Sequence, residues 1–305
     1  MYAGRMRPMT ANLQGSILMT ASMAAFTLND TCMKLLGGDL PFFQTLFLRS
    51  VGVTVLLIAA ALVTGAFRLP DDPRDRRLIL IRSGAEIVAA LAFISALFHM
   101  PIANITAIIQ ALPLTVTLGA ALVLKEPVGW RRFTAIGIGL SGVLLIVRPG
   151  GEGFTGWSAM ALLAVAGVTV RDLAARRLSK DVPTMTVALA AAIGVGLTAG
   201  AGAAVTEWRP LTGTDWLRLA GAVIFVFGGY VFSVMTMRVG EIGAVAPFRY
   251  TSLLVALVVG LTVFGEWPDG LTLIGSAIVV ATGLFTLIRE RAKGIEPAPP
   301  GLRIR

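Results

Sequence analysis

Charged side chains within long apolar segments are the residues of this sequence with the greatest capacity for chemistry. They are Asp30, Arg49, Glu86, Arg171, Asp172 and Arg249. A charge inside a membrane-spanning helix costs about 2.5 to 3.5 kcal/mol on insertion scales, so each residue needs a partner, a wet cavity or a function. The chemistry that this set favours is recognition of charged groups and binding of protons.

Arg249 and Arg49 are the strongest candidates for direct contact with a ligand. No acidic residue lies within one helical turn of Arg249 on its own segment. A guanidinium binds a carboxylate through two parallel hydrogen bonds, so we expect Arg249 or Arg49 to face an anionic group of a solute. The alternative is an interhelical salt bridge to Glu86, Asp172 or Asp30.

Two pairs of opposite charge have the spacing of a local helical ion pair. Lys34 follows Asp30 by four residues, and Arg176 follows Asp172 by four. Together with Arg171 they could form gate layers near opposite faces of a membrane. Alternatively, each is a local pair near a helix end whose long basic side chain reaches toward water.

Glu86 is a candidate both for the solute site and for proton binding. Burial in a low-dielectric bundle disfavours the charged form of a carboxylate. Arg82 lies four residues earlier and stabilises the ionised form, and we favour this structural ion pair. Asp30 and Asp172 are the other intramembrane proton acceptors.

Uncharged polar residues complete the candidate site. Tyr250 adjoins Arg249, and Asn104, Gln110 and Tyr230 could supply hydrogen bonds. Polar side chains in membrane bundles more often bridge helices, at about 0.6 kcal/mol on average. We therefore rank the last three below the arginines.

Several kinds of chemistry lack their motifs. The sequence contains no phosphate-binding GxxxxGK[ST] run, no GxSxG elbow and no HExxH pair. Cys32 and His99 are the only residues of their types, which excludes a Cys/His metal cluster. We expect neither an enzyme nor a metal or cofactor site, and no nucleic-acid partner, because the basic residues of this +9 chain are not clustered.

The elements that position these residues are expected to be ten transmembrane helices. The chain is 56% hydrophobic and 14% charged, against about 25% charged in soluble domains. A bilayer core needs about 20 apolar residues per helix. Such windows fall at 12–35, 42–64, 78–99, 101–123, 130–148, 155–178, 183–206, 214–237, 242–263 and 268–289.

The distribution of Lys and Arg predicts the orientation. These residues concentrate in the segment 1–11, in alternate loops, and in the tail 290–305. Cytoplasmic loops of membrane proteins are enriched in Lys and Arg, so both termini are predicted to be cytoplasmic, in an inner (plasma) membrane. Trp157, Trp208, Trp216 and Trp267 fall at the opposite ends of the spans, as in an aromatic belt.

The chain contains an internal repeat. Residues 26–41 align without a gap with 168–183, and residues 102–126 with 242–266. The halves, 12–148 and 155–289, have five spans each, so the second enters the membrane from the opposite side. Inverted repeats are typical of secondary transporters, where two exchangeable packings expose a central site alternately. The alternative is that duplication only enlarges a bundle.

The matched segments resemble the two EamA repeats of the drug/metabolite transporter superfamily. The resemblance rests on Asp39-Leu-Pro41, Leu48-Arg49, Ala107 to Glu126, Gly137 with Gly142, Pro247-Phe-Arg-Tyr250, Gly265-Glu266, Gly275 and Gly283. It implies a ten-helix bundle with cytoplasmic termini and a central cavity, and members that export amino acids or other metabolites or take up cofactors and nucleoside derivatives. Ala191 stands where the first repeat has Arg49, so the halves are not functionally equivalent.

Our prediction is an all-α secondary transporter that exports amino acids or similar metabolites by alternating access through a central cavity. The alternatives are an uptake carrier for a vitamin or nucleoside derivative, and a gated channel. The expected partners are a small-molecule substrate and membrane lipid, with proton coupling through the intramembrane acids. Monomer and homodimer both stay open.

Overall fold

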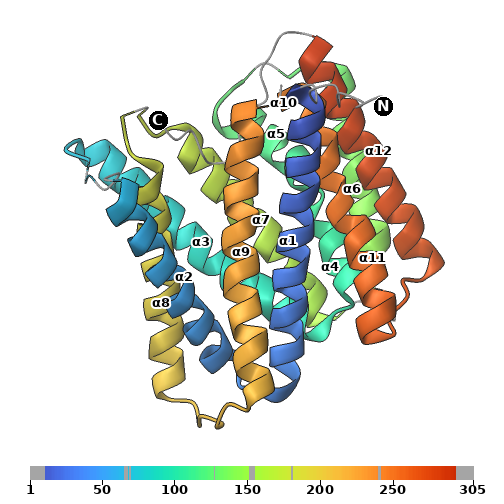
Figure 1. The fold of residues 1–305 in the computed structure, drawn as a ribbon. Helices are drawn as coiled ribbons and strands as arrows, with labels where there is room; N and C mark the ends of the chain where they lie inside the picture. Colours follow the sequence, from blue (N-terminus) through green and yellow to red (C-terminus); the bar gives the residue numbers. More distant parts are fainter. Residues whose placement is uncertain are drawn as a thin grey trace, which may run out of the picture.

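The computed structural model describes residues 11–292 except 65–67, 69, 127, 151–154, 180 and 240–241. Most of the predicted terminal segments, 1–10 and 293–305, lie outside the described residues. The described chain is helical throughout (Figure 1). Its elements are α1 Ala11–Asp39, α2 Phe42–Thr64, α3 Pro73–His99, α4 Ile102–Ile109, α5 Leu112–Val123, α6 Trp130–Val147, α7 Gly156–Arg176, α8 Thr184–Ala204, α9 Gly213–Val239, α10 Ile242–Val245, the 3-10 helix η1 Ala246–Tyr250, α11 Thr251–Phe264 and α12 Gly270–Ala292.

Nine segments of the described chain are long and apolar enough to cross a membrane. Two of them combine shorter elements: Ile102–Val123 contains α4 and α5, and Ala246–Phe264 contains η1 and α11. The helix α1, 29 residues long, accompanies α9 along the bundle and makes the tenth (Figure 1). The ten-helix membrane fold expected from the sequence is confirmed.

The lower hydropathy of α1 follows from its place in the interior. Its polar residues Ser22, Thr27, Asn29 and Thr31 are buried, and the Ser22 hydroxyl donates to the backbone oxygen of Gly229 on α9 at 2.7 Å. Polar side chains are tolerated within a membrane bundle where neighbouring helices supply their partners. This helix therefore brings hydrogen-bonding groups to the centre of the protein.

The fourth and ninth spans are broken helices, although the sequence predicted each as continuous. In the first half the break lies at Gln110 and Ala111, just before Pro113. Proline has no N–H, and its ring clashes with the carbonyl four residues earlier. In the second half Pro247 lies in the 3-10 helix η1, which ends at Tyr250, the residue that the repeat aligns with Gln110.

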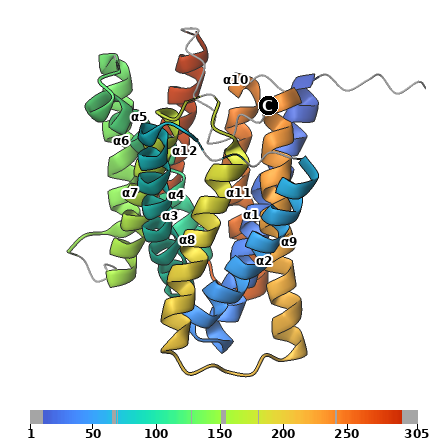
Figure 2. The same cartoon turned by 90° about the vertical axis from the view of Figure 1, so that its left-hand side faces the viewer.

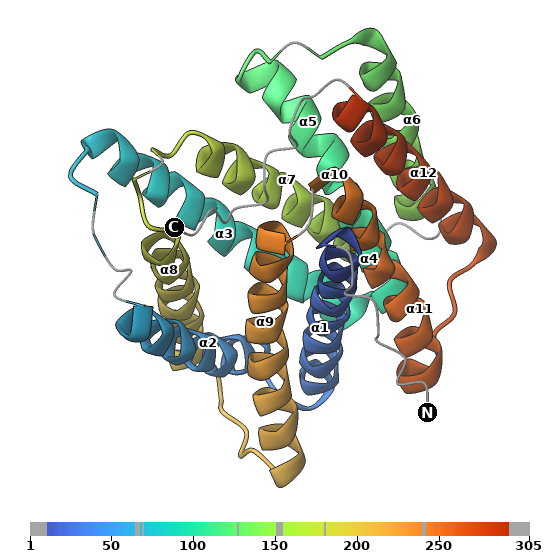
Figure 3. The same cartoon turned by 45° about the horizontal axis from the view of Figure 1, so that its top comes forward.

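The helix packing follows an approximate two-fold symmetry. The first half contains α1 to α6 and the second α7 to α12. The first-half helices α1 and α3 pack against α9 and α7, while α2 packs on its counterpart α8 and α6 on α12. In the same way, α11 packs on α1 and its counterpart α5 packs on α7. Figure 3 shows α1, α2, α3, α7, α8 and α9 arranged in a ring, with the remaining helices gathered on one side. Exchanging the halves reproduces this pattern, as inverted repeats require.

Equivalent backbone conformations confirm the symmetry at the ends of α5 and α11. Lys125 and Gly265, which the repeat aligns, both have a left-handed backbone with φ of 56° and 64°. The next residues, Glu126 and Glu266, each donate their backbone N–H to the carbonyl six residues earlier, at 3.2 and 2.8 Å. Both helices therefore end in the same cap.

Side-chain contacts repeat as well. Gln44, at the start of α2, donates to the carbonyl of Arg209 at 2.7 Å and accepts from its N–H at 2.9 Å. Its counterpart Thr186, on α8, donates to the carbonyl of Arg68 at 2.8 Å and accepts from its N–H at 3.3 Å. These contacts lie at opposite ends of the bundle and attach α2 and α8 to neighbouring loops.

The two ends of the bundle, at the top and bottom of Figure 2, carry different residues. We call one the tryptophan end; there the α6–α7, α8–α9 and α11–α12 connections contain or adjoin four exposed tryptophans, Trp157, Trp208, Trp216 and Trp267. The other is the arginine end, where the α2–α3, α5–α6 and α7–α8 connections contain or adjoin exposed arginines such as Arg74, Arg76, Arg131 and Arg177. Interfacial tryptophans and loop arginines are typical of spans that meet water at these levels.

Candidate functional site

Arg171 on α7 lies at the centre of an ionic network between the halves. Its guanidinium donates to Glu86 on α3 at 3.2 Å and to the adjacent Asp172 at 2.9 Å. The three side chains retain 24%, 22% and 21% of their exposure. Glu86, for which Arg82 was the expected partner, is therefore held by the opposite half, while Arg82 donates to the carbonyl of Val187 at 3.4 Å.

Asn29 forms the corresponding centre in the first half. Its amide donates to Asp30 at 2.8 Å and accepts from the Arg49 Nε at 3.0 Å. The repeat aligns Asn29 with Arg171, and each of them donates to the aspartate that follows it. The amide thus separates the Arg49 guanidinium from the Asp30 carboxylate and orients both.

Arg49 and Arg249 form no ion pair with a carboxylate among the described residues. Arg49 uses only Nε, toward Asn29. The Arg249 guanidinium makes no hydrogen bond within the described chain, and the acid that interacts with it electrostatically is Asp172. The interhelical salt bridge to Asp30, Glu86 or Asp172, which was the alternative interpretation for Arg249, is therefore not made in this structure.

The charges of the described network do not cancel. It contains four guanidiniums and three carboxylates, which leaves one positive charge in excess; the members are Arg49, Arg82, Arg171 and Arg249 with Asp30, Glu86 and Asp172. An excess cation in a low-dielectric bundle attracts an anion strongly. The network therefore has the charge to accept one carboxylate.

Tyr230 on α9 belongs to the same region. Its ring packs edge to face on Phe26 of α1, with 5.3 Å between the centroids. It interacts electrostatically with Glu86, Arg171 and Arg49, yet it retains 42% exposure. Tyr230 therefore lies beside the charged groups of the network, and a role in solute binding stays a prediction.

The other polar candidates make no hydrogen bond to the charged side chains of the network within the described residues. Gln110 is 8% exposed and donates to the Ser252 hydroxyl at 2.7 Å and to the Arg249 carbonyl at 3.1 Å, so it joins the two broken helices. Tyr250 is 7% exposed, with its hydroxyl against Gly283 of α12. Asn104 lies on α4, and its buried Oδ1 has no partner in the described chain. These placements favour helix packing for Gln110 and Tyr250.

Lys34 and Arg176 pair with glutamates of the opposite half. The prediction that they form local pairs with Asp30 and Asp172 is therefore wrong. Lys34 donates to Glu266 at 2.7 Å, and Arg176 donates to Glu126 at 3.5 Å. Both glutamates follow the left-handed caps of α11 and α5, which turn them toward these basic residues. Their matching positions at the ends of the aligned segments were the signal for this contact.

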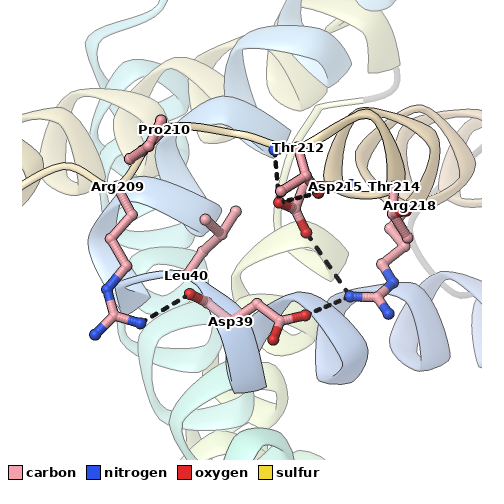
Figure 4. Close-up of a pocket in the computed structure, with 8 residues that line it drawn as sticks. All are labelled: Asp39, Leu40, Arg209, Pro210, Thr212, Thr214, Asp215 and Arg218. Atoms are coloured by element: carbon pink, nitrogen blue, oxygen red, sulfur yellow. Dashed lines mark hydrogen bonds and ion pairs between the residues drawn. The ribbon is translucent and has the colours of Figure 1, made fainter.

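A surface pocket of about 470 Å³ lies at the tryptophan end, apart from the network (Figure 4). Arg218 on α9 pairs there with Asp39 of α1 at 2.5 Å and with Asp215 at 3.7 Å. Arg209 donates to the Asp39 carbonyl at 3.2 Å, so the lining groups are paired with one another (Figure 4). The pocket marks a junction between the halves.

Asp269 joins α6 to α12 at the same end. Its carboxylate accepts from the backbone N–H of Thr272 at 2.8 Å and pairs with Arg148. The Thr272 N–H, with help from Arg148, holds the pKa of Asp269 below its usual range. The carboxylate therefore stays ionised at neutral pH and caps α12. Among the described residues no group of three acidic, His or Cys side chains could hold a metal ion.

Ten helices in two inverted halves, with an ionic network between them, define a polytopic membrane transporter. The chain belongs to the EamA-like transporter family, whose model matches residues 13–148 and 155–288. These two segments coincide with the two halves of the fold.

Relatives of known activity transport small metabolites in both directions. An S-adenosylmethionine uptake transporter of Rickettsia prowazekii is 21% identical over 92% of this chain and 94% of its own. A riboflavin transporter of Vibrio cholerae is 26% identical over 92% and 95%. A pseudopaline exporter of Pseudomonas aeruginosa is 24% identical over 89% and 96%. Small-metabolite transport is thereby supported, and amino-acid export is not singled out.

A crystal structure of a protein with the same fold covers 92% of this chain and 98% of its own, at 21% identity and a TM-score of 0.61. At this identity the similarity supports a shared fold alone.

Proposed function

We propose that this protein is a secondary transporter for amino acids or similar metabolites, and that the solute binds at the network through Arg49 and Arg249. The observation that carries the proposal is that these two guanidiniums form no ion pair in the described chain. Leaving a charged donor unpaired inside a membrane is costly. A carboxylate of the solute would supply the missing partner through two parallel hydrogen bonds.

The arrangement around Asn29 favours a solute that also carries an ammonium group. Asn29 holds the Arg49 guanidinium and the Asp30 carboxylate one amide apart. An α-amino acid presents a carboxylate and an ammonium with similar proximity, so Arg49 would bind the first and Asp30 the second. Tyr230 and Glu86 would border this site. S-adenosylmethionine, the substrate of one relative, contains such a group.

We favour export across the inner membrane. The arginine end would then face the cytoplasm, because loop arginines stay on the cytoplasmic side. Uptake of a vitamin or nucleoside derivative is the second candidate, and the names of the relatives support it. Protonation of Asp30, Glu86 or Asp172 would couple either direction to a proton gradient.

Purified protein in liposomes tests the proposal with labelled amino acids, S-adenosylmethionine and riboflavin, with and without a proton gradient. A hydrogen bond to a charged group contributes about 1.5 to 3 kcal/mol. Arg49→Gln and Arg249→Gln should therefore each weaken apparent affinity for the transported amino acid by about 10- to 100-fold. Arg74→Gln, at an exposed position of the arginine end, is the matched control.

Wild-type affinity in both variants would contradict the assignment of the site. Countertransport of labelled solute against its gradient identifies a carrier, whereas conductance in planar bilayers identifies a channel. Transport of riboflavin but not of any amino acid would show that the proposed substrate class is wrong, while the proposed transport function would stand.

A further inference from the structure

The contact between Lys34 and Glu266 has an exact sequence counterpart at the other end of the bundle. The repeat aligns Lys34 with Arg176 and Glu266 with Glu126. Each pair joins a basic residue of one half to a glutamate of the other. Inverted repeats place these two equivalent contacts at opposite ends, the first at the tryptophan end and the second at the arginine end.

The pair at the tryptophan end is fully engaged. The Lys34 ammonium donates to both Glu266 oxygens, at 2.7 and 3.0 Å, and to the Met100 carbonyl at 2.6 Å. Glu266 also accepts from the backbone N–H of Ile102 at 3.1 Å. The Lys34 side chain is 9% exposed. This set joins α1, the α3–α4 connection and the end of α11, and we call it the tryptophan-end latch.

The equivalent pair at the arginine end is loose. A distance of 3.5 Å separates Arg176 from Glu126, and their side chains are 26% and 51% exposed. Exposed ion pairs of this kind contribute little to stability. We call this pair the arginine-end latch. The repeat aligns Ile102 with Ile242, so the backbone N–H of Ile242 is the additional donor that a closed arginine-end latch would recruit.

The difference between the two latches is local. The left-handed caps that precede Glu126 and Glu266 are alike, and Gln44 and Thr186 make the same pair of backbone hydrogen bonds at opposite ends. The two halves therefore have the same local geometry next to the latches. The difference of engagement between the two latches therefore does not come from the caps or from the Gln44 and Thr186 contacts, which are alike at both ends.

We propose that the two latches engage alternately during transport. In this structure the tryptophan-end latch is fully engaged, whereas the arginine-end latch is held only by the 3.5 Å contact between Arg176 and Glu126. In the opposite state Arg176 and Glu126 close on the Ile242 N–H, while Lys34 and Glu266 separate. Each glutamate acts as a positioning residue that stabilises one state, and removal of its charge shifts the population toward the other. The inference rests on the alternating access of the proposed function.

Opposite effects of two matched substitutions test the latches. The reporter is Phe26→Cys, beside Tyr230 at the centre of α1, in a Cys32→Ala background that removes the native thiol. A membrane-impermeant maleimide is applied separately to each end in right-side-out and inside-out vesicles. Glu266→Gln should raise the labelling rate from the tryptophan end several-fold and lower it from the arginine end, and Glu126→Gln should do the reverse.

The exchanged pair Lys34→Glu with Glu266→Lys should return the labelling rates toward those of the parent, because it restores the attraction. If both Gln variants changed the labelling rates in the same direction, or if neither changed them, the proposal would be overturned. A purely structural role of the glutamates predicts no opposite effects of the two substitutions. Monodisperse elution in detergent checks folding. The readout needs no substrate, so a wrong solute assignment leaves its outcome unaffected.

Discussion

The Arg171 side chain contacts carboxylates from both halves of the protein. Glu86 belongs to α3 of the first half and Asp172 follows Arg171 on α7 of the second. Two carboxylates this close to one cation depend on it, because a partly buried charge without a partner is costly. Arg171 is therefore engaged by the protein itself, which distinguishes it from Arg49 and Arg249 and excludes it as the first contact of an anionic solute.

The dependence of Glu86 on Arg171 can be measured. Arg171→Gln should lower the free energy of unfolding by about 2 to 4 kcal/mol, because it leaves two carboxylates uncompensated. Adding Glu86→Gln should recover part of that loss, since one of those charges is removed. Thermal unfolding of the purified single and double variants measures the coupling. Additive losses would show that the Arg171–Glu86 contact does not stabilise the fold.

The charged residues of the network were all identifiable from the sequence, because a charge within an apolar span is conspicuous. Their partners were not. Asn29 escaped notice because an uncharged amide is common in membrane bundles, although the repeat aligns it with Arg171. Glu126 and Glu266 lie just beyond their spans, where a glutamate is unremarkable. Their matching positions in the repeat mark them as equivalent, but the contacts with Arg176 and Lys34 are identified only by the structure.

At the scale of elements, a close crossing of α6 and α12 joins the last helices of the two halves. Helices α6 and α12 cross at Gly142 and Gly275: a Cβ on Gly275 would lie 2.5 Å from the Gly142 carbonyl oxygen and 2.7 Å from Ile146. Small residues at such crossings allow backbones to approach closely. These glycines therefore serve packing within the chain.

Gly275→Ala should destabilise the protein by about 1 to 3 kcal/mol, because the added methyl group forces α6 and α12 apart. Gly137→Ala is the matched control: it lies on the same helix pair, and a Cβ there meets nothing within 4 Å. The control should leave stability unchanged or raise it by up to about 1 kcal/mol through helix propensity. Thermal unfolding in detergent compares the two, and equal midpoints would contradict a tight crossing.

The spans themselves were predictable because hydrophobic length is dictated by the bilayer. The breaks in the fourth and ninth spans were not, since a proline inside an apolar segment can kink a helix or interrupt it. The pairing of α1 with α9 and of α3 with α7 follows from the symmetry of the repeat only once one of the two pairs is known. Hydropathy carries no information on it.

At the scale of the whole molecule, symmetry and asymmetry have separate roles. In the proposed alternating access, the shared packing of the halves would provide two states of comparable stability. The network is asymmetric, because the repeat aligns Arg49 with Ala191 and Asn29 with Arg171. A solute bound in such a network meets the same groups in either state, so exchange of the latches can change its exposure while its contacts persist.

The distribution of charge predicts the orientation in the membrane, and this prediction can be tested on the same Cys32→Ala background. The arginine end carries basic loops, and translocating them across the membrane is unfavourable. Thr214→Cys, exposed at the tryptophan end, should react with an impermeant maleimide on intact cells, whereas Asp71→Cys, exposed at the arginine end, should react only after permeabilisation. The reverse pattern would place the arginine end outside the cell and exchange the assignments of the latches. Labelling of both cysteines on intact cells would mean that the chain inserts in both orientations, and it would contradict the assignment of the arginine end to the cytoplasm.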